Sequence, residues 1–195
     1  GVERIQRFAF EIARSRPRKL LTLVTKSNAQ RHGMVMWDEI FEEISQDYRD
    51  ITTDKMLVDA MTTRMVLDPQ SIDTVVASNL HADILTDLAA SLSGSMGIAP
   101  TGNLDPEKRH PSMFEPIHGS AFDIMGQGIA NPIGSYWSAV MMLENLGELK
   151  ASQRLMSAIE KLTSDKKILP KDLGGKSSTK EVTKAMINII SGKNK

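Results

Sequence analysis

Short apolar segments that alternate with amphipathic helical segments constrain the fold of this chain more than any other feature. Residues 20–25 form a β-branched, apolar run that is long enough for a buried strand and too short for a helix. Residues 51–55 and 72–77 read as further strands, each separated from the next by a segment of helical periodicity. Strands that alternate with helices in this way predict an α/β protein.

The helical segments are predicted from apolar side chains that recur at helical spacing. They are residues 2–15, a segment with Met34, Trp37, Phe41, Ile44 and Tyr48 on its buried face, residues 56–67, the stretch after Asn79, and residues 132–146, 151–163 and 178–191. The buried stripe expected for the first helix is Val2, Ile5, Phe8, Ala9, Ile12 and Ala13. Residues 99–111 contain prolines and a glycine, so we expect a long loop there.

The composition excludes several classes of function. The 195 residues carry 24 basic and 24 acidic side chains, so no excess positive charge is available to bind nucleic acid. Cysteine is absent, which excludes disulfides and thiolate metal sites. No signal peptide or membrane-spanning run is present, and we expect a cytoplasmic protein. Because the chain starts at Gly1 without methionine, we expect a cut or processed end.

Asp83 and Asp87 are the strongest candidates for metal ligands. They lie four residues apart in a helical segment, which places both carboxylates on one face. Their neighbours are apolar, and paired carboxylate oxygens suit a hard ion such as Mg²⁺ or Mn²⁺. An ordinary helix with two surface aspartates explains the same spacing. Asp59 also lies among apolar residues, so it occupies a wet edge of its helix or faces a cation or partner.

Two further places have the residues of a binding site. Lys26 follows the strand at 20–25, and ligands of α/β proteins bind at the carboxyl ends of strands, although a solvated loop lysine is an equal alternative. Residues 115–131 combine three glycines with a serine, a histidine and aspartate, which suits close approach of backbone to a ligand. A generic surface loop has the same composition. The glycine pattern is not the strand-to-helix fingerprint of Rossmann proteins.

These residues together resemble the β-decarboxylating dehydrogenases, the isocitrate/isopropylmalate dehydrogenase family. The resemblance rests on Lys26, on the segment Asn79–Asp87 with the trailing Gly94–Ile98, and on Glu115–Asp123, in the family's order. Within the family the chain looks most similar to the tartrate and D-malate dehydrogenases. The resemblance implies an α/β, three-layer isopropylmalate-dehydrogenase-like fold that is not a Rossmann fold, and of which this chain is the C-terminal half.

The resemblance also implies an active site shared by two subunits of a homodimer. Asp83 and Asp87 would bind Mg²⁺ or Mn²⁺ from one subunit, and Asp59 would reach the same ion from the other. Lys26, contributed with Asp59 across the dimer, would accept the proton of the substrate hydroxyl. Lys26 and Asp59 are therefore the expected catalytic residues, and no nucleic acid or membrane partner is expected.

The glycine-containing loop would bind the adenosine half of NAD. In that reading His118 lies against the adenine, the small residues after it admit the cofactor, and Asp123 holds the ribose hydroxyls. A carboxylate there repels a 2′-phosphate, so NAD is favoured over NADP. The expected cofactor-binding residues are Glu115, His118, Gly119, Ser120, Ala121, Asp123 and Asn131.

The implied organisation is the later part of a smaller, dimerising and metal-binding domain over residues 1–94, followed by the C-terminal part of a larger NAD-binding domain over residues 95–195. The implied activity is metal-dependent, NAD-linked oxidation and β-decarboxylation of a 2-hydroxy dicarboxylic acid such as D-malate or tartrate, with this fragment inactive by itself. Two alternatives stay open. One is 3-isopropylmalate dehydrogenase, which Ala29 disfavours because isopropylmalate enzymes usually carry a branched residue there. The other is a truncated, non-catalytic relative that acts as an interaction module.

Overall fold

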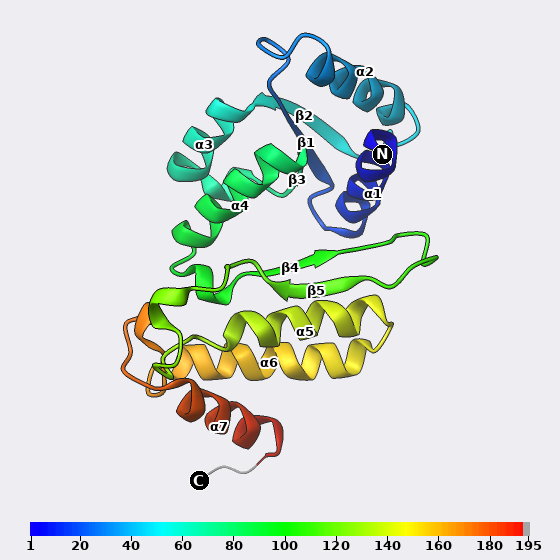
Figure 1. The fold of residues 1–195 in the computed structure, drawn as a ribbon. Helices are drawn as coiled ribbons and strands as arrows, with labels where there is room; N and C mark the ends of the chain where they lie inside the picture. Colours follow the sequence, from blue (N-terminus) through cyan, green and yellow to red (C-terminus); the bar gives the residue numbers. More distant parts are fainter. Residues whose placement is uncertain (193–195) are drawn as a thin grey trace. The chain divides into compact units, whose positions relative to one another are not determined.

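The computed structural model of the protein describes residues 1–192, and the chain divides into two compact units. The first unit is Gly1–Ala89 and the second begins at Ala90. Figure 1 shows a parallel sheet flanked by helices in the first unit, and a β-hairpin with three helices in the second. The predicted roles of residues 1–94 in dimerisation and metal binding and of residues 95–195 in NAD binding stay predictions.

The first unit contains a three-stranded parallel sheet of order β2-β1-β3. Its elements are α1 (Val2–Ser15), β1 (Leu20–Thr25), α2 (Gly33–Ser45), β2 (Thr52–Leu57), α3 (Val58–Leu67), a 3₁₀ turn (Pro69–Ser71), β3 (Thr74–Val76) and α4 (Asn79–Leu92), which continues past Ala89. Thr25 pairs with Leu57, so the carboxyl ends of β1 and β2 lie side by side. The predicted strands and helices are therefore confirmed, with β3 shorter than expected.

Helices cover both faces of the sheet, in which β1 is the central strand. Successive side chains of a strand point to opposite faces, and Leu21 and Leu23 pack with Phe10 of α1 and Phe41 of α2. Val24 lies in a separate cluster with Met61 of α3 and Leu85 of α4. The first unit is thus three layers, with α1 and α2 on one face and α3 and α4 on the other (Figure 1).

The predicted buried face of α1 is partly wrong. Ile5 is 43% exposed, whereas the residues that α1 buries are Gln6, Ala9, Phe10 and Ala13. The buried face of α1 is turned toward Phe10, because the Phe10 ring stacks on the rings of Phe41 and Tyr48. The ring centroids lie 5.1 Å and 4.6 Å apart, respectively. Burial of Gln6 is partly compensated, since its Nε2 donates to the carbonyl of Trp37 at 2.9 Å.

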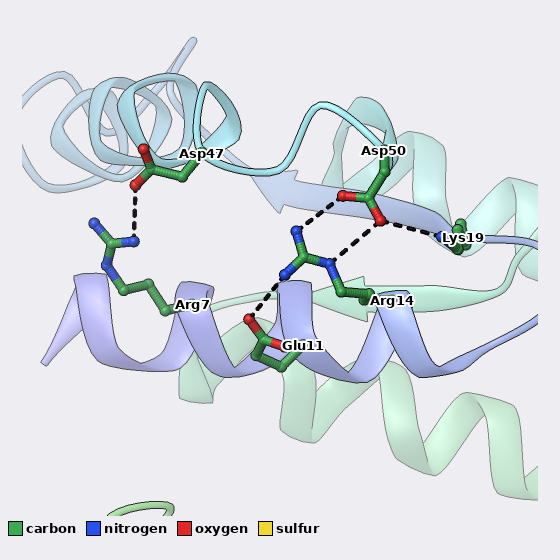
Figure 2. A network of polar contacts seen from close by, with 6 residues as sticks. All are labelled: Arg7, Glu11, Arg14, Lys19, Asp47 and Asp50. Atoms are coloured by element: carbon green, nitrogen blue, oxygen red, sulfur yellow. Dashed lines mark hydrogen bonds and ion pairs between the residues drawn. The ribbon is translucent and has the colours of Figure 1, made fainter.

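Ion pairs connect α1 to the segment that follows α2 (Figure 2). Arg14 binds Asp50 at 2.8 Å and lies over the Tyr48 ring, 4.5 Å from its centroid. Lys19 binds the second oxygen of Asp50 at 3.1 Å. Hydrogen bonds from Arg14, and then from Lys19, lower the pKa of Asp50 from 3.8 to about 2.

The second unit contains a β-hairpin, three α-helices and short 3₁₀ turns. Its elements are a turn at Met96–Ile98, β4 (Pro100–Asn103), β5 (Met113–Pro116), turns at Phe122–Ile124 and Lys171–Leu173, α5 (Ile133–Asn145), α6 (Leu149–Asp165) and α7 (Thr179–Ile190). The three predicted helices are confirmed. Its core joins all three, with Val140 of α5, Leu162 of α6 and Val182 of α7 among the buried side chains. Over residues 1–192, none of the helices combines the length and the apolar character needed to cross a membrane.

The loop predicted over residues 99–111 is wrong at its start, because β4 pairs there with β5 in an antiparallel hairpin. Pro100, one of the prolines that suggested a loop, pairs with Pro116 at the hairpin's open end, where the two prolines interrupt no central ladder. The tip is ordered by Asp105, whose carboxylate accepts the backbone N–H of Arg109 at 2.8 Å and of His110 at 2.9 Å.

Candidate functional site

Lys26 and Asp59 form the polar pair at the carboxyl edge of the sheet. Lys26 follows the last residue of β1, and Asp59 is the second residue of α3, directly after β2. Because these strands end in register, the Lys26 Nζ atom comes within 2.6 Å of Asp59 Oδ1. The hydrogen bond from Lys26 holds the pKa of Asp59 below its ordinary value. The two residues predicted to be catalytic are thus brought together.

The segment after Lys26 is anchored by a second polar group. Ser27 Oγ donates to Asp38 Oδ2 at 2.8 Å, and Lys55 Nζ binds the same carboxylate oxygen at 3.2 Å. The backbone N–H of Gln30 donates to the Lys26 carbonyl at 2.9 Å and closes a turn. Asp38 therefore helps to fix the chain that carries Lys26.

Asp83 and Asp87 lie one turn apart on α4, and both are exposed. The buried side of this helix carries His81 and Leu85, so the two aspartates occupy the opposite, accessible side. Oxygen donors at this spacing fit a hard divalent cation. Within residues 1–192, no group of three acidic or histidine side chains is close enough to hold a metal ion. Since Asp59 was expected to come from a second subunit, the metal site stays a prediction.

A cavity of about 950 Å³ lies in the second unit and is lined by most of the residues predicted to bind a cofactor. His118, Gly119, Ser120, Ala121 and Asn131 line it. The predicted residues Glu115 and Asp123 are not among its lining side chains. Glu115 pairs with Thr101 in the hairpin, and Asp123 lies in the 3₁₀ turn after Ala121.

The backbone of this loop is shaped for close approach to a ligand. Ala121 has φ 43°, and Gly126 and Gly128 have φ 79° and 67°, in the left-handed region. The Nδ1 atom of His118 lies 3.0 Å from the Gly119 carbonyl, an oxygen that can only accept a hydrogen bond. A roomy cavity with small residues, one imidazole and backbone polar groups fits an adenine nucleotide.

Other lining residues were not among those predicted to bind a cofactor. They are Ser95, Met96 and Gly97 before the hairpin, and Lys171, Asp172, Thr179 and Lys180 before and at the start of α7. One usable signal existed, because Ser178 and Glu181 have the spacing of a capping box and do form one. That motif places Thr179 at a helix N-terminus, where it donates to the Gly128 and Ala130 carbonyls of the cavity loop.

Comparison with known proteins identifies the family. The model of the isocitrate/isopropylmalate dehydrogenase family matches residues 1–189. The chain belongs to this family. A crystal structure of isocitrate dehydrogenase from Methylococcus capsulatus superimposes with a TM-score of 0.92 at 38% identity, over 97% of this chain and 56% of that one. The predicted α/β fold of the isocitrate/isopropylmalate dehydrogenase family is thereby confirmed.

Curated members of the family include close relatives of the chain. A probable tartrate dehydrogenase/decarboxylase from Agrobacterium vitis is 64% identical over 194 residues, which are 100% of this chain and 54% of the relative. The decarboxylating D-malate dehydrogenase of Escherichia coli K12 is 46% identical over 195 residues, covering 97% of this chain and 54% of the relative. The chain therefore spans about half the length of the relatives it matches.

Proposed function

We propose that this chain is part of an enzyme that catalyses the oxidation and β-decarboxylation of a 2-hydroxy dicarboxylic acid such as D-malate or tartrate. The proposed reaction depends on a metal ion and on NAD. The observation that carries the proposal is the Lys26–Asp59 pair, 2.6 Å apart at the carboxyl ends of two parallel strands. The 64% identity to a probable tartrate dehydrogenase/decarboxylase supports this substrate class.

Lys26 is the proposed base. Its amine accepts the proton of the substrate hydroxyl when hydride leaves the adjacent carbon, which requires a side chain that reaches solvent-accessible space. The Lys26 side chain is 27% exposed and is oriented by Asp59, while the Ser27–Asp38 hydrogen bond holds the following residue. The amine of Lys26 is thus accessible, while the backbone that carries this lysine is held in place.

Asp83 and Asp87 are the proposed ligands of a divalent cation, with Asp59 of a second copy. The cavity loop containing His118 and Asn131 is the proposed seat of the adenosine half of NAD. When bound, the cation supplies Lewis-acid polarisation of the substrate oxygens, and NAD supplies the hydride acceptor. The protein's own contribution is to hold these groups and to move the hydroxyl proton through Lys26.

The test uses the full-length protein that carries this chain. We expect NAD reduction with D-malate or tartrate in the presence of Mn²⁺, and its loss on removal of the metal with EDTA. The variant K26M should reduce kcat by about 10²–10⁴-fold, the usual contribution of a general base. The matched variant K150M, which removes an exposed lysine of α6, should stay close to the wild type. Unchanged activity in K26M would contradict the proposal.

A complementation experiment tests whether two copies share each site. K26M and D83N damage residues that are proposed to serve the same site from different copies. Each variant should be inactive alone, and a mixture refolded together should regain activity, because one of the two sites in a mixed dimer keeps both residues. Mixtures that stay inactive would show that both residues serve a site from one chain.

The alternative 3-isopropylmalate dehydrogenase differs only in the pocket for the substrate side chain. Ala29 occupies the position three after Lys26, and its small side chain favours a substrate without a branched group. Assays with 3-isopropylmalate beside D-malate and tartrate distinguish the two, and a higher kcat/KM for 3-isopropylmalate would replace the proposed substrate.

A further inference from the structure

Three segments that are distant in sequence meet at one carboxylate beside the cavity. Asp172 Oδ2 accepts a hydrogen bond from Ser95 Oγ and another, at 2.8 Å, from Asn131 Nδ2. Ser95 follows α4, Asn131 precedes α5 and Asp172 lies in the turn before α7, and all three line the cavity. A single oxygen atom therefore joins three walls of the proposed nucleotide site.

Both polar atoms of the Asn131 side chain form hydrogen bonds within the protein. Its Nδ2 donates to Asp172, and its Oδ1 accepts the backbone N–H of Ile133 at 2.9 Å, at the start of α5. An amide held in this way has a fixed orientation, because rotation would break both hydrogen bonds. Asn131 consequently holds the backbone between residues 131 and 133 in place.

Ser95 is fixed on the opposite wall by a comparable arrangement. It is buried, and its Oγ accepts the N–H of Gly97 at 2.9 Å while donating to Asp172. A Cβ atom at Gly97 would lie 2.6 Å from Asp172 Oδ2 and 3.0 Å from Asn131 Cβ. The carboxylate is thus packed directly against the Gly97 backbone, and its position fixes the spacing between the two walls.

We propose that Asp172 is a positioning residue for dinucleotide binding, which holds the turn after Ser95 and the Asn131 backbone at the spacing that an adenine nucleotide requires. This inference rests on the proposed function, since it takes the cavity to be the adenosine site. In this inference the Asn131 side chain does not contact adenine directly. Its amide holds the wall, and the wall contacts the ligand.

The experiment measures binding in the full-length protein with the variants D172N and S95A. The control D165N changes an exposed aspartate whose partner is Lys167 at 3.3 Å, away from the cavity lining. Dissociation constants are measured for AMP by calorimetry and for NADH by fluorescence, and kcat is measured at saturating NAD. AMP isolates the adenosine half of the site from the chemistry.

D172N should raise the dissociation constants of AMP and NADH by the same factor, about tenfold, which corresponds to 1.4 kcal/mol. The kcat at saturating NAD should change by less than about twofold, because uniform binding affects KM alone. S95A should raise the AMP dissociation constant by about threefold, through loss of one of two hydrogen bonds to the carboxylate. D165N should leave all three quantities unchanged.

Two results would overturn the inference. If D172N binds AMP as tightly as the wild type, the carboxylate does not organise the site. If D172N weakens binding and S95A does not, Asp172 acts by direct contact with the ligand and not by positioning. If D172N fails to fold, the AMP dissociation constant of S95A tests the inference in its place. Failure of the proposed function is distinct, because a wild-type protein that binds neither AMP nor NADH lacks the nucleotide site altogether.

Discussion

Lys26 Nζ and Asp59 Oδ1 lie 2.6 Å apart although 33 positions separate the residues in sequence. Neither residue is inside a strand. Each follows the end of its own strand, and the parallel register that pairs Thr25 with Leu57 brings the two ends together. The ion pair is thus a direct consequence of strand pairing, and a shift of register by one residue would separate it.

The pair predicts an unusual titration of Asp59. The hydrogen bond from Lys26 holds the Asp59 pKa below its ordinary 3.8, so the carboxyl should titrate below that pH in a ¹³C NMR experiment. Because the folded pKa is the lower one, the pair stabilises the fold above the ordinary carboxyl pKa and loses its effect as pH falls through the folded value. In K26M the midpoint should return toward 3.8. An Asp59 midpoint that K26M leaves in place would contradict this assignment.

Asp50 predicts a pH-dependent contribution to thermal stability. Arg14 and Lys19 lower its pKa from 3.8 to about 2, so D50N should lower the melting temperature at pH 6. The depressed pKa means that this stabilisation is present above pH 3.8 and is lost as pH falls through about 2, where D50N and wild type should melt together. Because these groups are exposed, the difference at pH 6 should shrink in about 1 M salt. A gap that persists below pH 2 would show a cause other than charge.

The orientation of α1 predicts opposite outcomes at two apolar positions. Phe10 is fully buried between Phe41 and Tyr48, so F10A should cost about 3–5 kcal/mol in the free energy of unfolding. Ile5 is 43% exposed, and I5A should stay within about 0.5–1 kcal/mol of the wild type. Urea unfolding with an unchanged m-value measures both. A larger cost for I5A than for F10A would mean that α1 buries the face that the sequence first suggested.

Two helical glycines predict opposite effects of alanine. A Cβ atom at Gly134 would lie 2.9 Å from the Gly97 carbonyl and 3.2 Å from Pro116 Cβ, so G134A should destabilise the protein by about 1–3 kcal/mol through overpacking. Gly33, the first residue of α2, has no atom within 4 Å of that position. G33A should therefore stabilise by about 0.4–1 kcal/mol. Thermal unfolding of both variants checks the pair, and stabilisation by G134A would mean that α5 does not approach Gly97 so closely.

The secondary structure was largely predictable where local signals agree. The apolar run Leu20–Thr25 was predicted with its observed bounds, and Pro17 and Pro69 follow the ends of α1 and α3. Prediction was wrong at Pro100, because a proline at the open end of a hairpin looks locally the same as one in a loop. Only the distant partner strand β5 distinguishes the two cases.

The sequence by itself determined the alternation of strands and helices, the family resemblance, and the residue types available at the site, since periodicity and motifs are local properties of the chain. The tertiary structure decided which of these residues meet. Ser95, Asn131 and Asp172 share one carboxylate oxygen, yet no spacing in the sequence relates them. The physical reason is that a hydrogen bond depends on the distance between atoms in the folded chain, which packing of the core sets and sequence separation does not.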